Sequence, residues 1–380
     1  MILDSTVRTN SFAVDACSVY SYTGATYIVN GLPVTCMAGR LQEQLESPYF
    51  RPMNILITGG AGYIGSHTAK AVALAGHVPV TYDNLSTGYR WAVRWGPFIQ
   101  GDVGNYDLLV SVLRDYAVEA VIHFAASAYV NVSMHSPAEY FQNNSVNSLT
   151  LLNAMRKAGA RNIVFSSTCA TYGLPRQKVL SERHPQNPIN PYGESKRFIE
   201  RALHWYGGAY DIHWVALRYF NAAGADPEGE TGEDHDPETH LNPLVISATL
   251  CQTAPVAVCG TDYPTPDGTA IRDYVHVMDL ASAHIRALEY LLDGGESIAL
   301  NIGTGKGHSV REVISSVERV SGQLVPQHDA ARREGDPPRL VARTTLARRV
   351  LGWTPKYRDL DETIRTAWRW HSAQRSQENT

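Results

Sequence analysis

Short apolar runs alternate with stretches of helical periodicity from residue 53 onward. The apolar runs are predicted to be buried strands at 54–57, 78–82, 97–101, 120–124, 162–165 and 213–218. Helical periodicity fills the intervals at 66–76, 105–116, 137–158 and 192 to about 206. Strands that alternate with helices are typical of a parallel sheet with helices on both faces. The pattern therefore predicts an α/β protein with a doubly wound parallel sheet.

The alternation of strand and helix patterns becomes less regular after Asn221. The stretches 226–242 and 263–268 are rich in Gly, Pro and acidic residues and are predicted to be loops, and shorter elements follow them. We expect 222–375 to form mainly a smaller C-terminal α/β lobe that binds substrate, with segments that return to the first domain at 53–221. Such a lobe would cover the carboxyl ends of the strands, where ligands bind in open α/β sheets.

The first 52 residues do not share this pattern. They lack clear periodicity, and they have no basic segment followed by a long apolar core, so a secretory signal is not indicated. Met53 directly precedes the first predicted strand. We therefore expect 1–52 to be either a poorly ordered extension or a mis-assigned segment upstream of a native start at Met53. Mass spectrometry of the natively expressed protein would distinguish the two.

A glycine-rich turn joins the first strand to the first helix, with the sequence TGGAGYIG at Thr58–Gly65. This order places backbone N–H groups at a helix N-terminus, where partial positive charge suits a pyrophosphate. Gly59 is expected to permit the tight turn, Gly62 to let backbone approach phosphate, and Gly65 to let the helix pack on the strand. The turn predicts a Rossmann-type dinucleotide site.

The second strand ends in Asp83, 18 residues after Gly65. An acid at this position can bind the diol of an adenosine ribose, and it would repel a 2′-phosphate. The sequence therefore favours NAD over NADP as the cofactor.

Tyr192 and Lys196 stand four residues apart in a predicted helix, so both lie on one face. A tyrosine with an ordinary pKa near ~10 is a poor base at neutral pH. A nearby ammonium and the positive charge of oxidised nicotinamide would favour the phenolate. Tyr192 could then take a proton from a sugar hydroxyl, Thr168 could hydrogen-bond the reacting oxygen, and Lys196 could hydrogen-bond the nicotinamide ribose.

The composition limits the classes of partner that the chain is expected to bind. The 380 residues carry a formal net charge of −4, which gives no indication of nucleic-acid or membrane binding, and no apolar stretch reaches membrane-spanning length. The five cysteines are scattered and form no Cys-x-x-Cys motif, as in a reduced cytoplasmic protein. We expect no metal, nucleic-acid or membrane partner, and a cytoplasmic location.

These residues together resemble the extended short-chain dehydrogenase/reductase family, and within it most closely the UDP-glucose 4-epimerases. The resemblance spans about 53–370, and the segment at 267–279 (DGTAIRDYVHVMD) is especially specific to these epimerases. It implies a set of cofactor-binding residues for the adenosine, pyrophosphate and nicotinamide parts of NAD. These residues are Gly59, Gly62, Tyr63, Ile64, Gly65, Asp83, Asn84, Asp102, Val103, Phe124, Ala125, Ala126, Asn143, Tyr192, Lys196 and Tyr219.

The resemblance also implies a site for a UDP-sugar. Arg272 and Arg333 suit a diphosphate, because the guanidinium fork matches phosphate oxygens, and Asp336 suits the uridine ribose. The predicted substrate-binding residues are Thr168, Tyr192, Asn221, His240, Leu241, Arg272, Arg333 and Asp336.

The residues after Thr168 decide between reactions of the family. Related 4,6-dehydratases usually carry an Asp-Glu pair there, whereas this chain has Cys169 and Ala170, which cannot move the proton that elimination requires. Transient oxidation at C4 and return of the hydride to the other face need no further acid. The resemblance thus implies a UDP-glucose/UDP-galactose 4-epimerase.

Two kinds of alternative stay open at this level. The substrate could be another UDP-sugar: UDP-GlcNAc/UDP-GalNAc, UDP-xylose/UDP-arabinose or UDP-glucuronate. Leu340 occupies a position at which a tyrosine tends to exclude N-acetyl groups in relatives. A non-catalytic sensor of NAD or sugar nucleotides is less favoured, because such proteins commonly lose the tyrosine or the lysine. By analogy with relatives, helices 105–116 and 137–158 would form a homodimer interface.

Overall fold

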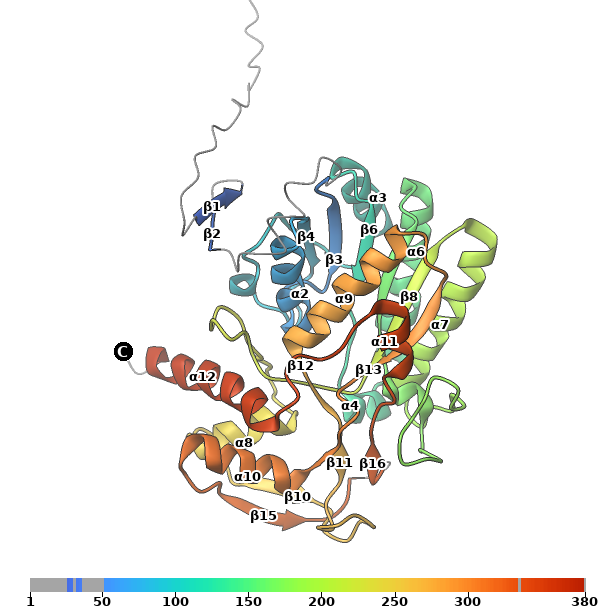
Figure 1. Ribbon diagram of the computed structural model, residues 1–380. Coiled ribbons are helices and arrows are strands. Elements are labelled where there is room, and N and C mark those ends of the chain that lie inside the picture. Colours follow the sequence, from blue (N-terminus) through green and yellow to red (C-terminus); the bar gives the residue numbers. More distant parts are fainter. Residues whose placement is uncertain (1–25, 30–31, 36–50, 334–335, 379–380) are drawn as a thin grey trace, which may run out of the picture. The chain divides into compact units, whose positions relative to one another are not determined.

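A parallel sheet of seven strands forms the centre of the unit Pro52–Thr380. Its strands lie in the order β13 (Ile298–Ile302), β8 (His213–Tyr219), β7 (Asn162–Thr168), β6 (Ala120–His123), β3 (Asn54–Thr58), β4 (Val78–Asp83) and β5 (Phe98–Gln100) (Figure 1). Every neighbouring pair is parallel. The chain order reverses at β3, between β4 and β6, as in a doubly wound sheet. The predicted fold class is confirmed.

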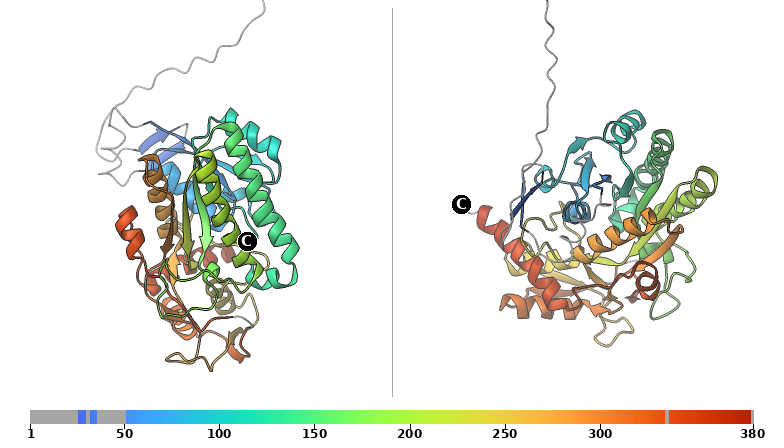
Figure 2. Two further views of the ribbon diagram at one scale, coloured as in Figure 1. Left: turned by 90° about the vertical axis from the view of Figure 1, so that its right-hand side faces the viewer. Right: turned by 45° about the horizontal axis from the view of Figure 1, so that its top comes forward.

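The sheet is buried on both faces because its strands alternate between two cores. Ile55 and Ile57 pack on one side with α2 (Tyr63–Leu74), α9 (Val277–Leu292) and α11 (Thr345–Leu351). Leu56 packs on the other side with α3 (Tyr106–Asp115), α6 (Asn147–Ala158) and α7 (Pro191–Tyr210). Both layers of helices are visible beside the sheet in Figure 2. This arrangement explains the continuous apolar runs of the sequence.

A smaller C-terminal lobe gathers beyond the carboxyl ends of the strands, in the lower part of Figure 1. Its core combines Val245, Val258, Val317 and Ile364 from four different elements. Those elements and their parallel partner strand are α8 (Leu241–Thr249), β10 (Val256–Cys259), α10 (Val310–Ser321), β15 (Gln327–Ala330) and α12 (Leu360–Glu378).

Short strands connect the lobe to the sheet. β9 (Asn221–Ala223) pairs with β12 (Tyr274–His276), and β11 (Ile271–Arg272) pairs with β14 (His308–Ser309) and β16 (Arg339–Leu340). Buried Asp273 lies between β11 and β12 and accepts hydrogen bonds from the backbone N–H groups of Thr304, Gly305 and Ala342. Because β13 lies in the central sheet, the chain returns there from the lobe. The boundary predicted at 221/222 stays a prediction.

Two predicted helices differ from the observed ones. The first begins at Tyr63 rather than Ser66 and ends at Leu74, so the last glycine of the turn lies inside α2. The stretch 137–158 is not one α-helix: α5 (Pro137–Tyr140) leads into a π-helical segment, Phe141–Val146, and then into α6. The remaining short elements are α4 (Val130–His135) and the 3₁₀ turns Arg90–Ala92 and Cys169–Tyr172.

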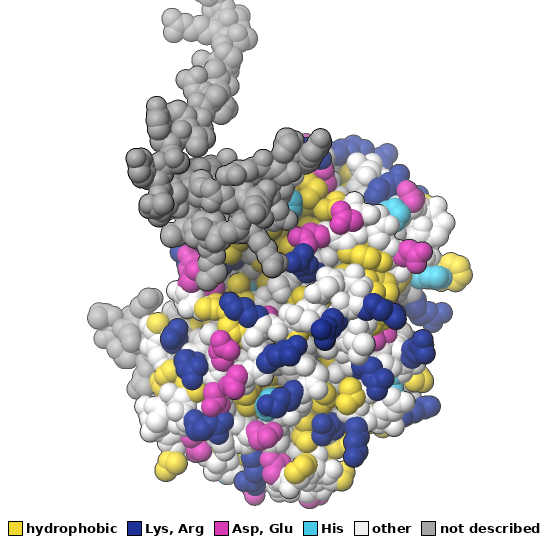
Figure 3. Space-filling model, viewed as in Figure 1, with side chains coloured by type: hydrophobic (Ala, Val, Ile, Leu, Met, Phe, Trp, Pro, Cys, Tyr) yellow, Lys and Arg dark blue, Asp and Glu magenta, His cyan; other side chains and the backbone are white. Residues whose placement is uncertain are grey.

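The computed structural model describes residues 26–29, 32–35, 51–333 and 336–378. Within the unit Met1–Arg51, β1 (Thr26–Val29) and β2 (Leu32–Thr35) pair as an antiparallel hairpin. The remainder of 1–50 lies outside the described residues, so the expectations for the first 52 residues stay predictions. Basic and acidic side chains are interspersed on the face in Figure 3. No described helix combines the length and apolarity that crossing a membrane requires.

Candidate active site

The glycine turn between β3 and α2 has the conformation that its sequence predicts. Gly59 has a φ of +71°, and a side chain there would meet the backbone nitrogen of Ala125 at 2.6 Å. A Cβ on Gly65 would lie 2.1 Å from the carbonyl oxygen of Gly59. Glycine at position 65 therefore lets α2 pack closely against the glycine turn as well as against the strand. Both positions require glycine.

The N-terminus of α2 fits a pyrophosphate. Gly62 is the N-cap, and a Cβ added there would make an ordinary van der Waals contact with the carbonyl oxygen of Gly59 at 3.4 Å. The N–H groups of a first helical turn have no partners within the helix. A pocket beside this turn is lined by Gly62, Tyr63, Ser66 and Tyr89, among others. An anion would be bound here by backbone groups and the helix dipole.

Asp83 stands at the end of β4 and contacts the glycine turn. Its carboxylate accepts hydrogen bonds from the backbone N–H groups of Ala61 (3.0 Å) and Leu85 (2.8 Å). Burial raises the pKa of Asp83, and these two hydrogen bonds act in the opposite direction. Asn84 donates to Asp102 at 2.8 Å, so the residues predicted for the adenosine end lie side by side.

The loop after β6 borders the other side of the turn. The backbone N–H groups of Phe124 and Ala125 both donate to the carbonyl oxygen of Thr58. Asn143, in the π-helical segment, donates to Ser127 Oγ at 2.9 Å. Single π-helical turns are frequent at functional sites. Here the π-helical segment connects Asn143, a predicted cofactor residue, to the loop after β6, which contains others. Val103 is buried, and Ala126 and Ile64 are half-buried.

One face of α7 meets the end of β7. Lys196 Nζ donates to the carbonyl oxygen of Ser166 at 2.9 Å, and Tyr192 shares a side-chain hydrogen bond with Thr168. One turn further along, Glu200 accepts a hydrogen bond from Ser167 Oγ. The three residues Tyr192, Lys196 and Glu200, hereafter the α7 face, are spaced by four and contact three consecutive strand residues. The predicted catalytic residues are thus brought together.

Glu200 escaped the sequence analysis. Its carboxylate also pairs with buried Arg218, whose Nε lies 2.9 Å from Glu200 Oε1. Arg218 donates in turn to Tyr172 Oη at 3.1 Å. The spacing of four from Lys196 is the signal that could have identified Glu200 as a third residue of the same face.

Burial has the largest effect on the pKa values of the predicted catalytic pair, Tyr192 and Lys196. Burial raises the pKa of Tyr192 to about 12, and the hydrogen bond with Thr168 offsets only part of this effect. Burial also lowers the pKa of Lys196 to about 7. In the chain without cofactor, burial therefore determines the direction of the Tyr192 pKa shift, and the lowering expected from Lys196 does not. Tyr219, predicted at the nicotinamide end, is hydrogen-bonded to Ser166 Oγ and lies near this face.

The residues predicted for the uridine diphosphate lie on connecting strands and loops. Arg272, at the end of β11, forms an ion pair with Asp336 and donates to the carbonyl oxygen of Ile271. The backbone N–H of Asp336 donates to the carbonyl oxygen of Arg333, whose side chain is exposed. Asn221 begins β9 and donates its backbone N–H to the carbonyl oxygen of Asp273. Arg272 and Asp336 are brought together, whereas Arg333 projects from the surface.

Two further predictions fall at different places. Leu340 is half-buried against a cluster that includes Cys169, the residue after Thr168, together with Tyr172, Leu180, Phe220 and Ala342. His240 is the N-cap of α8, and Leu241 is the first residue of that helix. The imidazole of His240 contacts Glu233 and Glu238.

The chain is similar to epimerases over nearly their whole length. It is 52% identical over 318 residues to a UDP-glucose 4-epimerase of Rhizobium leguminosarum bv. trifolii, covering 84% of this chain and 97% of that protein. The crystal structure of UDP-glucose 4-epimerase from Brucella ovis in complex with NAD superposes with a TM-score of 0.82 at 52% identity, over 83% of this chain and 98% of that one.

A third relative is the Bifidobacterium longum UDP-glucose 4-epimerase in complex with NAD⁺ and UDP. It has a TM-score of 0.81 and 34% identity, over 84% of this chain and 98% of that one. A family model, described as the NAD dependent epimerase/dehydratase family, matches residues 55–303. This match covers the glycine turn, the end of β7 and the α7 face. The chain therefore belongs to the NAD dependent epimerase/dehydratase family.

Proposed function

We propose that the chain interconverts UDP-glucose and UDP-galactose by NAD-dependent inversion at C4. The observation that carries this proposal is the α7 face, which holds Tyr192 against Thr168 and Lys196 against Ser166 at the carboxyl end of β7. Similarity to UDP-glucose 4-epimerases, including one in complex with NAD⁺ and UDP, supports the same substrate and cofactor.

The chemistry that bound NAD supplies is acceptance of a hydride from C4 and its return. In the proposed mechanism Tyr192 Oη removes the proton of the C4 hydroxyl and later gives it back, while Thr168 Oγ1 holds the same oxygen. Burial keeps the Tyr192 phenol neutral in the chain by itself, and the positive charge of oxidised nicotinamide would favour its phenolate. Lys196 would position the nicotinamide ribose.

Cys169 supports epimerisation over dehydration. It follows Thr168, where related dehydratases carry an acid, and burial raises the pKa of its thiol to about 12. The thiol therefore stays neutral, and Ala170 has no ionisable group. Neither side chain can carry the proton of an elimination step, so returning the hydride is the outcome this site supports.

The remaining residue roles belong to the same proposal. The glycine turn and the loop after β6 would hold the NAD pyrophosphate, Asp83 and Asn84 the adenosine ribose, and Tyr219 the nicotinamide end. Arg272, Arg333 and Asp336 would bind the UDP portion, with Asn221, His240 and Leu241 beside it. The helix N-terminus at Gly62 and the ion pair of Arg272 with Asp336 support these assignments.

The proposal is tested by assaying UDP-galactose without added NAD. We expect turnover by the purified chain, with NAD released on denaturation and identified by mass spectrometry. Absence of UDP-glucose formation, even with NAD added, would contradict the proposal. Assays of UDP-GlcNAc, UDP-xylose and UDP-glucuronate belong in the same series, and turnover of UDP-GlcNAc/UDP-GalNAc alone would overturn the assigned sugar pair.

We further propose that the chain is a cytoplasmic homodimer. The predicted dimer helices expose the apolar residues Tyr106, Phe141 and Val146. The three described cysteines, Cys169, Cys251 and Cys259, are free thiols, as is typical of a reducing compartment. Light scattering should give a molecular mass of twice that of one chain. Val146→Glu should shift this mass toward that of a single chain. Fractionation of the native cells would test the location.

A further inference from the structure

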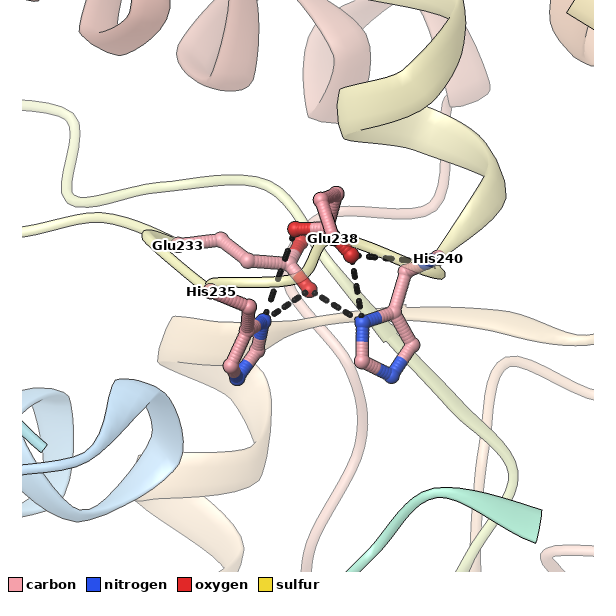
Figure 4. A group of neighbouring side chains, drawn as sticks. All are labelled: Glu233, His235, Glu238 and His240. Carbon is pink, nitrogen blue, oxygen red and sulfur yellow. Dashed lines mark hydrogen bonds and ion pairs between the residues drawn. The ribbon is translucent and has the colours of Figure 1, made fainter. Parts of the chain in front are cut away.

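Two glutamates and two histidines meet in the loop between β9 and α8. Glu233, His235, Glu238 and His240, hereafter the His–Glu cluster, all come from one short stretch of sequence. Their side chains point toward one another, as Figure 4 shows. The proposed reaction uses none of these groups except for a substrate contact by His240. The cluster therefore calls for its own explanation.

The distances within the cluster match a tetrahedral metal site. His240 Nδ1 lies 2.9 Å from Glu238 Oε1 and 3.1 Å from Glu233 Oε1. His235 Nδ1 lies 3.3 Å from Glu233 Oε1 and 3.5 Å from Glu238 Oε2. One potential ligand atom from each residue falls within 4.8 Å of all the others. A tetrahedral Zn²⁺ with bonds of about 2.0–2.1 Å separates neighbouring ligand atoms by about 3.3 Å.

The nitrogen of His235 is the second observation. Nδ1 is buried and makes no hydrogen bond, although carboxylate oxygens lie on two sides of it. Its direction therefore does not serve either carboxylate as an ordinary N–H donor. An imidazole nitrogen and two carboxylates that face one space form a donor set that Zn²⁺ can bind.

The neighbouring acidic group shows the contrast. Asp226, Glu228 and Glu230 also converge, but Lys70 Nζ lies 2.9, 2.5 and 2.7 Å from their carboxylates. That group already has its cation within the chain. The His–Glu cluster contains two carboxylates, of which Glu233 is only 5% exposed, and no lysine or arginine is paired with it among the described residues. Two imidazole donors favour a first-row transition ion over Ca²⁺ or Mg²⁺.

We propose that the His–Glu cluster binds one divalent transition-metal ion, of which Zn²⁺ is the best fit, and that this ion fixes the loop ahead of α8. The loop is already held at several points. The rings of Tyr63 and Tyr129 lie against His235 at 6.2 and 6.1 Å, and Trp370 donates to the carbonyl oxygen of Glu233. The ion would connect this loop to His240, the N-cap of α8, through Nδ1.

The test is metal binding by the full-length chain, purified without a histidine tag and stripped with a chelator. Calorimetric titration should show one equivalent of Zn²⁺ per chain, and elemental analysis after gel filtration should retain it. Co²⁺ should give the intense visible absorption of a tetrahedral site without a thiolate charge-transfer band. Zn²⁺ should also raise the melting temperature, because it binds the folded chain.

Single variants then locate the ion. Glu233→Gln, His235→Gln and His240→Gln should each weaken Zn²⁺ binding by at least about tenfold. Glu230→Gln, in the group neutralised by Lys70, is the matched control and should bind Zn²⁺ like the unmodified chain. These readouts do not depend on epimerase activity, so failure of the proposed reaction would leave them unaffected.

Three outcomes would overturn the proposal. The first is the absence of stoichiometric Zn²⁺ binding by the unmodified chain, which would identify the cluster as imidazoliums paired with carboxylates. The second is unchanged binding by the His235→Gln/His240→Gln double variant. The third is a Co²⁺ spectrum with octahedral or thiolate character. The first outcome needs no variant, so poor folding of a variant cannot protect the proposal.

Discussion

The two sides of the candidate active site satisfy their charges in opposite ways. On the side of the sheet, Lys196 is buried and bonded to a backbone carbonyl, and no carboxylate is paired with it among the described residues. On the side of the connecting strands, Arg272 is already paired with Asp336. A ligand at the first side supplies an interaction that the chain lacks. A diphosphate at the second side must compete with an interaction that the chain has made for itself.

The largest expected effect is at Tyr192. Tyr192→Phe should lower turnover of UDP-galactose by about 10²–10⁴-fold, because proton transfer from the C4 hydroxyl is lost. The fold and the bound NAD should remain, as measured by absorbance after denaturation. Tyr206→Phe is a matched control on the same helix, since its hydroxyl bonds Asn153 and not the active site. Undiminished turnover by Tyr192→Phe would show that another group is the base.

Lys196→Met should separate activity from stability. Below about pH 7 the folded chain contains the buried ammonium. Burial of this charge then lowers the free energy of unfolding by its full amount. Between about pH 7 and the ordinary lysine pKa of 10.5, the unfolded chain holds a proton that the folded chain has released, so stability rises with pH.

In the chain freed of nucleotide, the urea midpoint should therefore rise from neutral to alkaline pH more steeply with lysine than with methionine. Lys196→Met should also have the higher midpoint at pH 7, although its turnover is greatly reduced. A flat difference between the two midpoints across this range would contradict a buried, unpaired lysine.

Asp336→Asn tests the opposite side. The change ends the competition for Arg272, but it also removes the proposed contact to the uridine ribose, and we expect the loss of that contact to raise the KM for UDP-galactose by about tenfold, with a smaller change in kcat. Asp262→Asn is the control, because Asp262 forms an exposed pair with Arg332 at 2.7 Å, and exposed pairs contribute little. Equal effects of the two variants would argue against a substrate role for Asp336.

The smallest expected effect concerns substrate range. Leu340→Tyr places a larger side chain beside Cys169 and Phe220, so the ratio of kcat/KM for UDP-GlcNAc to that for UDP-glucose should fall by about tenfold. Leu340→Met, which is similar in volume, should leave the ratio unchanged. If the tyrosine variant also leaves the ratio unchanged, Leu340 does not border the sugar.

Local patterns predicted much of the region around the glycine turn. Buried parallel strands are visible in the sequence as continuous apolar runs. The glycine turn, Asp83 and the pair Tyr192–Lys196 depend on short, fixed spacings, which can be recognised in the sequence alone. The same reasoning could not predict that burial would hold the pKa of Tyr192 near 12. Desolvation depends on atoms brought in from distant segments, and no spacing records it.

Other features depend on partners that are far away in sequence. β13 joins the central sheet beside β8, after a detour through the lobe, and its short run is not distinguished from the other apolar runs of that half. The π-helical segment interrupts a helix whose periodicity looks regular, and Asn144 within it bonds Ser127 and Ser195 from elsewhere in the chain. The pairing of Arg272 with Asp336 likewise joins a strand end to a distant loop, and the sequence predicted each residue only as a ligand contact.

The contact between α12 and the loop ahead of α8 has a consequence for the order of biosynthesis. Trp370 packs where a side chain on Gly232 would stand, and it bonds the carbonyl oxygen of Glu233, 137 residues earlier. The glycine turn and the α7 face leave the ribosome long before Trp370 does, and domains fold in the order of synthesis. The nascent chain can therefore assemble its nucleotide-binding strands while the lobe is still incomplete. The helix α12, which is translated after the other described helices, completes the loop.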